Sequence, residues 1–226
     1  YEEFDSAKGN DDKLSKLLHR LHNIKIFDPA CGSGNFLIIA YKELRRLEMK
    51  VLREAGMFAL SGISLDQFYG IEIEDLAHEI AILSLWLAKH QMSIEFHKEF
   101  GKSKPTLPLR EAGNIVHGNA CRLDWNKVCP KDDKEIYILG NPPYLGARNQ
   151  KSHHKSDLKN IFINEYSSLD YVNAWFYLGA NYIANSNIKF AFVATNSITQ
   201  GEQVAMIWPK VLKNNLEINL AYQSFK

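Results

Sequence analysis

Residues 24–36 read Ile-Lys-Ile-Phe-Asp-Pro-Ala-Cys-Gly-Ser-Gly-Asn-Phe, and this stretch decides the fold. Residues 24–27 form a short run that is typical of a buried strand, and residues 37–53 have the pattern of a long helix. Gly32 and Gly34, between them, permit a sharp turn and a close approach of the backbone to a ligand. A strand, a glycine-rich turn and a helix in this order are typical of nucleotide-binding α/β folds.

Asp28 ends the strand and makes this turn unlike a phosphate-binding loop. A carboxylate at this place would repel a phosphate, because anion cradles are built from backbone N–H groups and positive charge. It suits a ligand that carries a cationic amino group or a sulfonium, such as S-adenosylmethionine. We therefore expect the turn to bind that cofactor.

Residues 68–73 predict the second strand, which ends in acidic residues. Glu72 falls where the acidic residue of a dinucleotide-binding fold meets the ribose hydroxyls. Alternatively, Glu72 caps the next helix together with Glu74 and Asp75, since acids favour a helix N-terminus. The two roles are compatible.

The helix expected next has an apolar stripe that we assign to the core, made of Leu76, Ile80, Leu83 and Leu87. Residues 91–113 are expected to form a loop, whose lysines either contact a phosphate backbone or are solvated. Residues 114–117 predict the third strand, and Asn119 just after it could hydrogen-bond to an adenine edge.

Residues 136–140 predict a fourth, buried strand, followed by Asn141-Pro142-Pro143-Tyr144. These residue types suit methylation of an exocyclic amino nitrogen, whose lone pair is delocalised into its ring. The side-chain oxygen of Asn141 and the carbonyl of Pro142 can accept its two N–H bonds, and Tyr144 offers a face for stacking. The prolines fix φ and remove competing donors. Asn-Pro and Pro-Pro are also common in simple turns.

Residues 145–160 are polar and basic, and we expect a phosphate-contacting loop or a mobile lid there. Its basic residues are Arg148, Lys151, His153, His154, Lys155 and Lys159. Further elements are expected as a helix over 169–184, a strand over 188–194, a helix near 203–212 and a last strand over 216–222.

Strands and helices alternate along the chain, so we predict an α/β fold with a mostly parallel, twisted sheet and helices on both faces. The glycine turn, Glu72, Asn119 and Asn141 follow successive strands and would share one rim of the sheet. Residues 1–23 are expected to be a helical lead-in, with Leu14, Leu17, Leu18 and Leu21 as its apolar stripe, and residues 24–226 the catalytic domain.

The composition is that of an ordinary globular protein: 46% of the 226 residues are hydrophobic and 23% are charged. No apolar run is long enough to span a membrane. Three cysteines without metal-ligand spacing favour a reducing cytoplasm and no metal. A net charge of +1 argues mildly against a nucleic-acid enzyme, or places the main binding surface outside this chain. Both ends look cut, so we expect a domain of a longer protein.

These motifs together resemble the class I S-adenosylmethionine-dependent methyltransferases, and most closely the methyltransferase domain of bifunctional Type II restriction–modification enzymes of the MmeI kind. The resemblance covers nearly the whole chain and is carried by residues 27–41, 70–91, 140–146 and 192–204. It implies methylation of the N6 amino group of adenine in double-stranded DNA, after the base has flipped out of the duplex.

The resemblance also implies roles for individual residues. Those assigned to the cofactor are Asp28, Pro29, Ala30, Cys31, Gly32, Gly34, Asn35, Phe36, Glu72, Ile73, Asn119 and Ala120, and those assigned to the target base are Asn141, Pro142, Pro143 and Tyr144. The segment 28–34 would hold the methionine part, Glu72 the ribose hydroxyls, and Asn119 with Ala120 the adenine.

In similar enzymes a nuclease lies upstream and a target-recognition domain downstream, so we expect both in the parent polypeptide, in the bacterial cytoplasm. Two alternatives stay open at this point. One is a methyltransferase for protein glutamine or ribosomal RNA, because the same four-residue motif serves those substrates in related families. The other is a non-catalytic module that senses S-adenosylmethionine and controls an attached nuclease.

Overall fold

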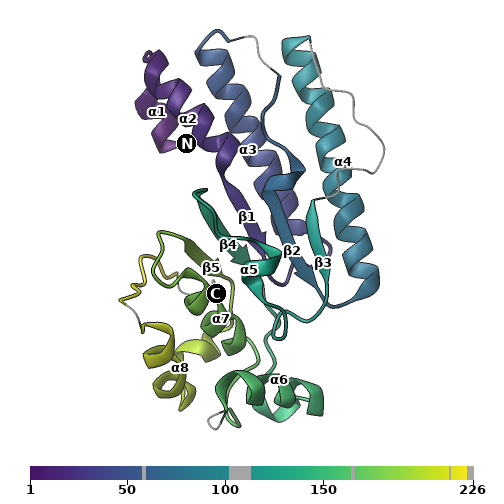
Figure 1. Cartoon of the computed structure of the whole chain (residues 1–226), viewed down its shortest axis with the longest axis vertical. Helices are drawn as coiled ribbons and strands as arrows, with labels where there is room; N and C mark the ends of the chain where they lie inside the picture. The colour runs from purple at the N-terminus through teal and green to yellow at the C-terminus, as the bar shows by residue number, and fades with distance from the viewer. Residues whose placement is uncertain (58–59, 102–112, 164–165, 214, 223–226) are drawn as a thin grey trace.

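The computed structural model describes residues 1–57, 60–101, 113–163, 166–213 and 215–222, and it is built on a five-stranded, fully parallel sheet (Figure 1). The strands lie in the order β3-β2-β1-β4-β5. Their bounds are β1 (Lys25–Asp28), β2 (Phe68–Glu72), β3 (Asn114–His117), β4 (Ile136–Gly140) and β5 (Lys189–Phe192). The predicted α/β class and the first five predicted strands are confirmed.

Helices cover both faces of this sheet, as predicted (Figure 1). One face carries α1 (Glu2–Ala7), α2 (Asp11–Asn23), α3 (Asn35–Glu54) and α4 (Asp75–Phe100). The second core takes residues from α5 (Trp125–Val128), α6 (Ser152–Phe162), α7 (Asn173–Ile183) and α8 (Gln203–Val211). Successive strand residues feed opposite cores: Ile26 packs in the first and Phe27 in the second. The described residues also include the short 3₁₀ helices η1 (Leu65–Gln67), η2 (Ala147–Asn149) and η3 (Asn196–Thr199).

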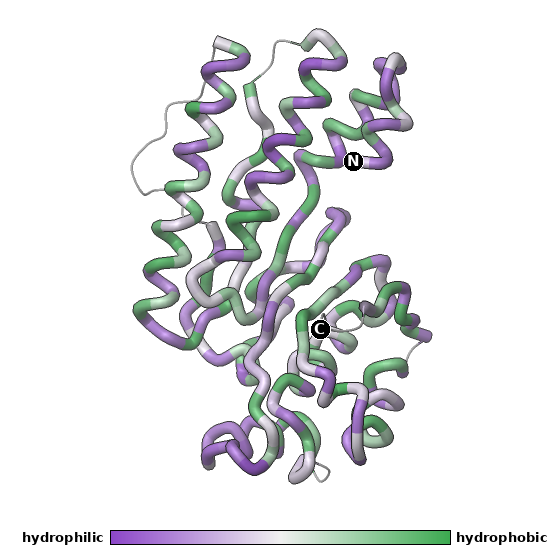
Figure 2. The backbone as a smooth tube through the Cα atoms, turned by 180° about the vertical axis from the view of Figure 1, so that it is seen from behind, coloured by the Kyte–Doolittle hydropathy of each residue, from purple (hydrophilic) through white to green (hydrophobic). Residues whose placement is uncertain are grey.

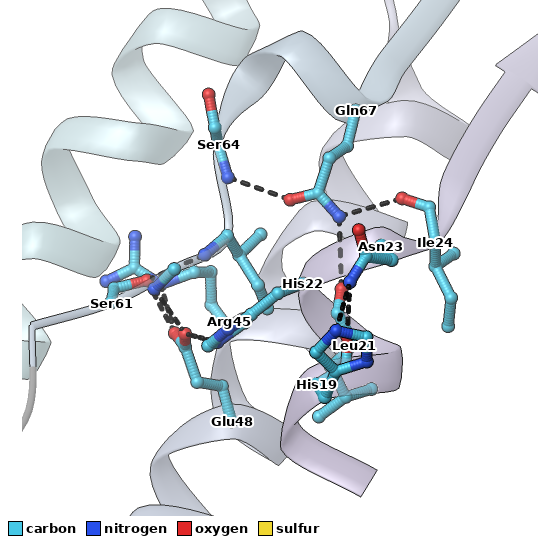
Figure 3. A network of polar contacts seen from close by, with 12 residues as sticks. His19, Leu21, His22, Asn23, Ile24, Arg45, Glu48, Ser61, Ser64 and Gln67 are labelled. Carbon is cyan, nitrogen blue, oxygen red and sulfur yellow. Dashed lines mark hydrogen bonds and ion pairs between the residues drawn. The ribbon is translucent and has the colours of Figure 1, made fainter. Parts of the chain in front are cut away.

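The helical lead-in is an integral part of the first core. Leu14, Leu17 and Leu21 of α2 are buried, and Leu18 packs partly buried beside them, so the predicted stripe is confirmed. The chain then turns directly from α2 into β1. Gln67 holds that turn, because its amide nitrogen donates to the carbonyls of Leu21, at 3.0 Å, and Ile24, at 2.7 Å (Figure 3).

The interpretation of the stripe on α4 is wrong. Leu76, Ile80, Leu83 and Leu87 are exposed, and Leu76 keeps 74% of its surface. The helix is apolar on two sides, and its other side faces the sheet through Ala81, Leu85, Ala88, Met92 and Phe96. Periodicity alone does not decide which of two stripes turns inward. The helix also continues to Phe100, so the predicted loop begins ten residues later, and residues 102–112 lie outside the described residues.

Two further expectations are corrected at the C-terminal half. Most of the basic segment 145–160 is helical, as η2 and α6, rather than a loop. Residues 216–222 form no strand: they pair with no strand of the described chain, and Leu220 and Tyr222 are exposed. An alternating apolar pattern makes a strand only where a neighbour supplies hydrogen bonds. The aromatic segment 169–184 is helical only from Asn173. No described helix is long and apolar enough to cross a membrane.

Candidate active site

The site lies where the strand order reverses. From β1 the chain proceeds outward to β2 and β3, then returns to β4 on the other side of β1. Ligands of open α/β sheets bind at this switch point, outside the carboxyl ends of the strands. The glycine turn follows β1 and the Asn141–Tyr144 loop follows the adjacent parallel strand β4, so both predicted motifs lie at the same edge of the sheet. In Figure 1 this rim faces α6, at the bottom of the view.

Two positive φ angles shape the glycine turn, +53° at Gly32 and +86° at Gly34. Residues with a side chain rarely adopt these angles, which is why the turn needs glycine. Gly34 also lets α3 approach α4, because a Cβ there would stand 3.3 Å from the Cα of Ala81. The predicted sharp turn is therefore confirmed, whereas the close approach of its backbone to a ligand stays a prediction.

Hydrogen bonds from the neighbouring strand β2 and from α7 hold the turn. The amide of Cys31 donates to the carbonyl of Ile71 at 3.0 Å, and the indole N–H of Trp175 in α7 donates to the carbonyl of Pro29, also at 3.0 Å. Asn35 and Phe36 then begin α3, and Phe36 remains 38% exposed beside the turn. The backbone that would meet a ligand is thus rigidly held.

Asp28 is buried and has one unsatisfied oxygen. Its Oδ1 accepts the amide of Ala30 at 3.0 Å, whereas Oδ2 has no hydrogen-bond partner among the described residues. Burial raises the pKa of Asp28 to about 7; the Ala30 amide opposes this rise and the Glu72 charge adds to it. A buried acceptor without a donor is costly. A cationic amino group placed here would satisfy it, so Asp28 fits the methionine end of S-adenosylmethionine.

Glu72 joins two backbone segments at the carboxyl edge of the sheet. Its Oε2 accepts the amide of Gly32 and its Oε1 the amide of Glu74, both at 2.8 Å. The first bond ties β2 to the glycine turn, and the second lies just before α4. The capping alternative is not borne out, because Glu74 is the N-cap residue of α4 and no side-chain capping hydrogen bond is formed there. A carboxylate has about four lone pairs, so capacity for two ribose hydroxyls remains. Ile73, next to it, is 53% exposed on this edge.

The side chain of Asn119 is already engaged within the protein. Its oxygen accepts the amide of Cys121 at 2.8 Å, and its nitrogen donates to Asp157 of α6 at 2.9 Å. Ala120 is buried, and its carbonyl accepts the indole N–H of Trp125 at 3.0 Å. The contact of this turn with adenine remains a prediction, and of the two N–H donors of the Asn119 amide nitrogen one is occupied by Asp157.

The Asn141–Tyr144 loop presents free polar groups. Asn141 and Pro143 are exposed, Pro142 is buried, and Tyr144 keeps 52% of its surface. Within the described residues no hydrogen bond engages the Asn141 amide or the Tyr144 hydroxyl. The loop therefore has acceptors and an aromatic face available to a ligand, next to the Asp28 turn.

Sequence reasoning missed the residues that hold this loop. Asp170 accepts the amide of Leu145 at 2.8 Å, and Gln150 donates to the carbonyl of Leu145 at the same distance. The only available signal was an acid inside an apolar, aromatic segment. The basic residues of the following segment do reach the surface: Arg148, Lys151, Lys155 and Lys159 are exposed, and Figure 2 shows α6 as largely hydrophilic.

Comparison with known proteins gives one consistent family. The family described as MmeI, DNA-methyltransferase domain, matches residues 4–226. DNA methyltransferase A of Bacillus subtilis (strain 168) is 51% identical over an alignment of 223 residues that covers 95% of this chain and 25% of that protein. The structure of the Type IIL restriction-modification enzyme MmeI in complex with DNA matches with a TM-score of 0.85 and 44% identity, over 93% of this chain and 29% of that chain. This chain thus spans about a quarter of the length of these relatives, shares their Rossmann-like methyltransferase fold, and belongs to the family of MmeI DNA-methyltransferase domains.

Proposed function

We propose that this chain transfers a methyl group from S-adenosylmethionine to the N6 amino group of adenine in duplex DNA, as the catalytic domain of a restriction–modification enzyme. The observation that carries this proposal is the unsatisfied, buried Asp28 carboxylate beside the free Asn141–Tyr144 loop. The first suits the cofactor's cationic end and the second an amino-bearing base. The match to DNA methyltransferases over nearly the whole chain supports DNA as the substrate.

The glycine turn and Glu72 would hold the cofactor. Asp28 would accept a hydrogen bond from its amino group, the backbone at Gly32 and Gly34 would lie against it, and Glu72 would accept the ribose hydroxyls. When bound, S-adenosylmethionine supplies an electrophilic methyl group. The protein contributes orientation rather than a covalent intermediate.

The base would be held by the loop after β4. The Asn141 oxygen and the Pro142 carbonyl would each accept one N–H of the adenine amino group, which turns its lone pair out of the ring plane. The ring of Tyr144, half exposed at the rim, would stack on the base. A base inside a duplex is out of reach, so adenine must flip out of the helix. The exposed cations of α6 would contact phosphates nearby.

Methyl transfer is tested with radiolabelled S-adenosylmethionine and the protein at its full natural length. Double-stranded DNA, ribosomal RNA and a glutamine-bearing protein are offered as substrates, and digested DNA is analysed for N6-methyladenine by mass spectrometry. We expect label in DNA adenine only. Label in RNA or protein alone, or cofactor binding without transfer to any substrate, would overturn the proposal.

The matched variants are Asn141→Ala and Asn160→Ala. Asn160 is also exposed, but it lies on α6. Asn141→Ala should lower the rate of transfer by at least about a hundredfold, with cofactor affinity nearly unchanged, because it removes an acceptor for the reacting amino group. Asn160→Ala should keep the normal rate. Normal turnover by Asn141→Ala would sink the assignment of the base site.

A further inference from the structure

Two buried aspartates flank the segment between α6 and α7, and neither belongs to a predicted motif. Asp157 lies in α6 with no exposed surface, and Asp170 lies just before α7 with 6% exposed. Each carboxylate receives donors from distant parts of the chain. A buried charge is costly unless well-placed donors satisfy it. The donors of each carboxylate therefore indicate which segments of the chain that aspartate holds in place.

Asp157 gathers three donors around the turn after β3. Its Oδ2 accepts the amide nitrogen of Asn119 and the hydroxyl of Tyr171, both at 2.9 Å, and its Oδ1 accepts Nε of Arg122 at 2.7 Å. Burial alone would raise the pKa of Asp157, but these three hydrogen bonds hold it below its usual value. The carboxylate is therefore ionised and fully engaged at neutral pH.

The consequence is that Asp157 orients Asn119. With its nitrogen on Asp157 and its oxygen on the Cys121 amide, the Asn119 side chain has one allowed orientation. The same turn is tied to β2, where the amide of Gly118 donates to the carbonyl of Glu72 at 2.8 Å. Asp157 thus fixes the rim on the side of Glu72, which is the cofactor side of the proposed site.

Asp170 holds the segment on the base side of the proposed site, at Leu145. Its Oδ1 accepts the amides of Leu145, at 2.8 Å, and Val172, at 3.3 Å, and its Oδ2 accepts the hydroxyl of Ser197 at 3.2 Å. The carbonyl of Leu145 is held as well, by the amide of Tyr171 at 3.1 Å. Leu145 directly follows Tyr144, so both peptide groups at the end of the base-binding loop are pinned.

We propose that Asp157 and Asp170 are positioning residues with separate tasks: Asp157 sets the cofactor half of the site through Asn119, and Asp170 sets the base half through Leu145. This inference rests on the proposed function. Neither aspartate is proposed to contact the substrate. The division of tasks follows from the partners, because Asp157 has no contact with the 141–145 loop and Asp170 has none with the 118–122 turn among the contacts given above.

The test is the separation of KM from kcat in two isosteric variants, Asp157→Asn and Asp170→Asn, of the protein at full natural length. An amide nitrogen in place of one oxygen donates where it should accept. Asp157→Asn should raise KM for S-adenosylmethionine by at least about tenfold and leave kcat within about threefold. Asp170→Asn should lower kcat by at least about tenfold and leave that KM within about threefold. Parallel changes in both variants, or none, would overturn the proposal.

If an aspartate variant does not fold, a milder variant that removes a single hydrogen bond takes its place in the test. Tyr171→Phe removes one hydrogen bond from Asp157, and Ser197→Ala removes one from Asp170. The same split, with smaller changes, is expected. If the wild type transfers no methyl group, the proposed function fails, but calorimetric titration with S-adenosylmethionine still tests the roles of the two aspartates. Weaker cofactor binding by the Asp157 variant alone supports the inference. An equal loss of cofactor affinity in both variants contradicts it.

Discussion

The carboxylate of Asp28 lies directly against the backbone of Gly140. A Cβ atom added to Gly140 would stand 2.6 Å from Asp28 Oδ1, closer than carbon and oxygen approach without a bond. Gly140 ends β4, immediately before Asn141, and Asp28 ends the neighbouring strand β1. The absence of one side chain therefore lets the cofactor motif and the base motif meet.

Gly140→Ala is expected to weaken S-adenosylmethionine binding by at least about tenfold, because Asp28 must leave its position. The fold should survive, since Gly140 has no positive φ angle. Gly146→Ala is the control: it lies beyond the same loop, and a Cβ there meets nothing within 4 Å. Calorimetric titration of both variants measures the effect. Unchanged affinity in Gly140→Ala would show that Asp28 does not contact the cofactor.

Asp28 should also destabilise the free protein at neutral pH. Burial raises its pKa from 3.8 to about 7, so the folded state holds its proton more tightly than the unfolded state. The fold therefore loses stability as pH rises between these values, by up to about 4 kcal/mol at 1.36 kcal/mol per pKa unit. Asp28→Asn removes the titration. Relative to wild type, it should gain stability from pH 5 to pH 8 while it loses cofactor affinity.

Urea unfolding at pH 5, 6, 7 and 8 without cofactor measures that gain. Ala30→Gly is a useful companion, because it keeps the amide that donates to Asp28 and leaves the titration in place. A stability difference between Asp28→Asn and wild type that stays constant over this pH range would contradict the raised pKa.

The sequence was most informative where backbone geometry demands one residue type. Gly32 and Gly34 predicted the turn correctly because only glycine adopts its φ angles readily. It was least informative about long-range partners. Nothing local shows that Asp157 reaches Asn119, or that Asp170 reaches Leu145, since each pair is joined only by tertiary packing.

The sequence also did not predict which side of a helix faces the sheet, and α4 shows why. The helix has apolar residues on two sides, so Leu83 and Leu85 are indistinguishable by type, yet Leu83 is 47% exposed and Leu85 is fully buried. A periodic pattern fixes which residues share a face but not which face meets the sheet. The tertiary contacts of α4 decide this, among them the close approach of Ala81 to Gly34, where a Cβ would stand 3.3 Å from the Ala81 Cα.

Because Leu85 is buried and Leu83 is exposed, replacing each by alanine should destabilise the fold by different amounts. Leu85→Ala leaves a cavity in the first core and should lower the free energy of unfolding by about 2–5 kcal/mol. Leu83→Ala should change it by less than about 1 kcal/mol, because its side chain is already half in solvent. Denaturant unfolding of both variants measures the difference. Equal losses would mean that the stripe of Leu76 to Leu87 is buried after all.

Tyr144 should act through its ring rather than its hydroxyl. No hydrogen bond within the described structure uses that hydroxyl, and about half of the residue's surface is exposed to solvent. Tyr144→Phe should keep methyl transfer within about threefold of wild type, whereas Tyr144→Ala should lose about 1–3 kcal/mol of base stacking, or roughly fivefold to 150-fold in kcat/KM. Steady-state kinetics on DNA decide between them. An equal loss in both variants would assign the role to the hydroxyl.

Glu48 is expected to stabilise the fold far from the rim, at the other end of α3. This buried carboxylate accepts the ring nitrogen of His22 at 2.8 Å, the hydroxyl of Ser61 at 2.5 Å and the amide of Gly62 at 2.7 Å (Figure 3). It thereby joins α2 and α3 to the segment that leads into β2. Although burial opposes it, these hydrogen bonds and the charge of Arg45 hold the pKa of Glu48 below its usual 4.5.

The stabilisation that Glu48 provides is therefore complete above pH 4.5 and is lost as pH falls below that value towards its folded pKa. Glu48→Gln should cost about 3–5 kcal/mol at pH 7, because it leaves the buried Arg45 without its carboxylate, and the cost should shrink in acid. Glu43→Gln, a half-exposed acid on the same helix, should cost less than about 1 kcal/mol. Thermal unfolding of both variants at pH 4 and pH 7 measures this. A cost for Glu48→Gln that is equal at both pH values would show that the loss comes from packing and not from the charge.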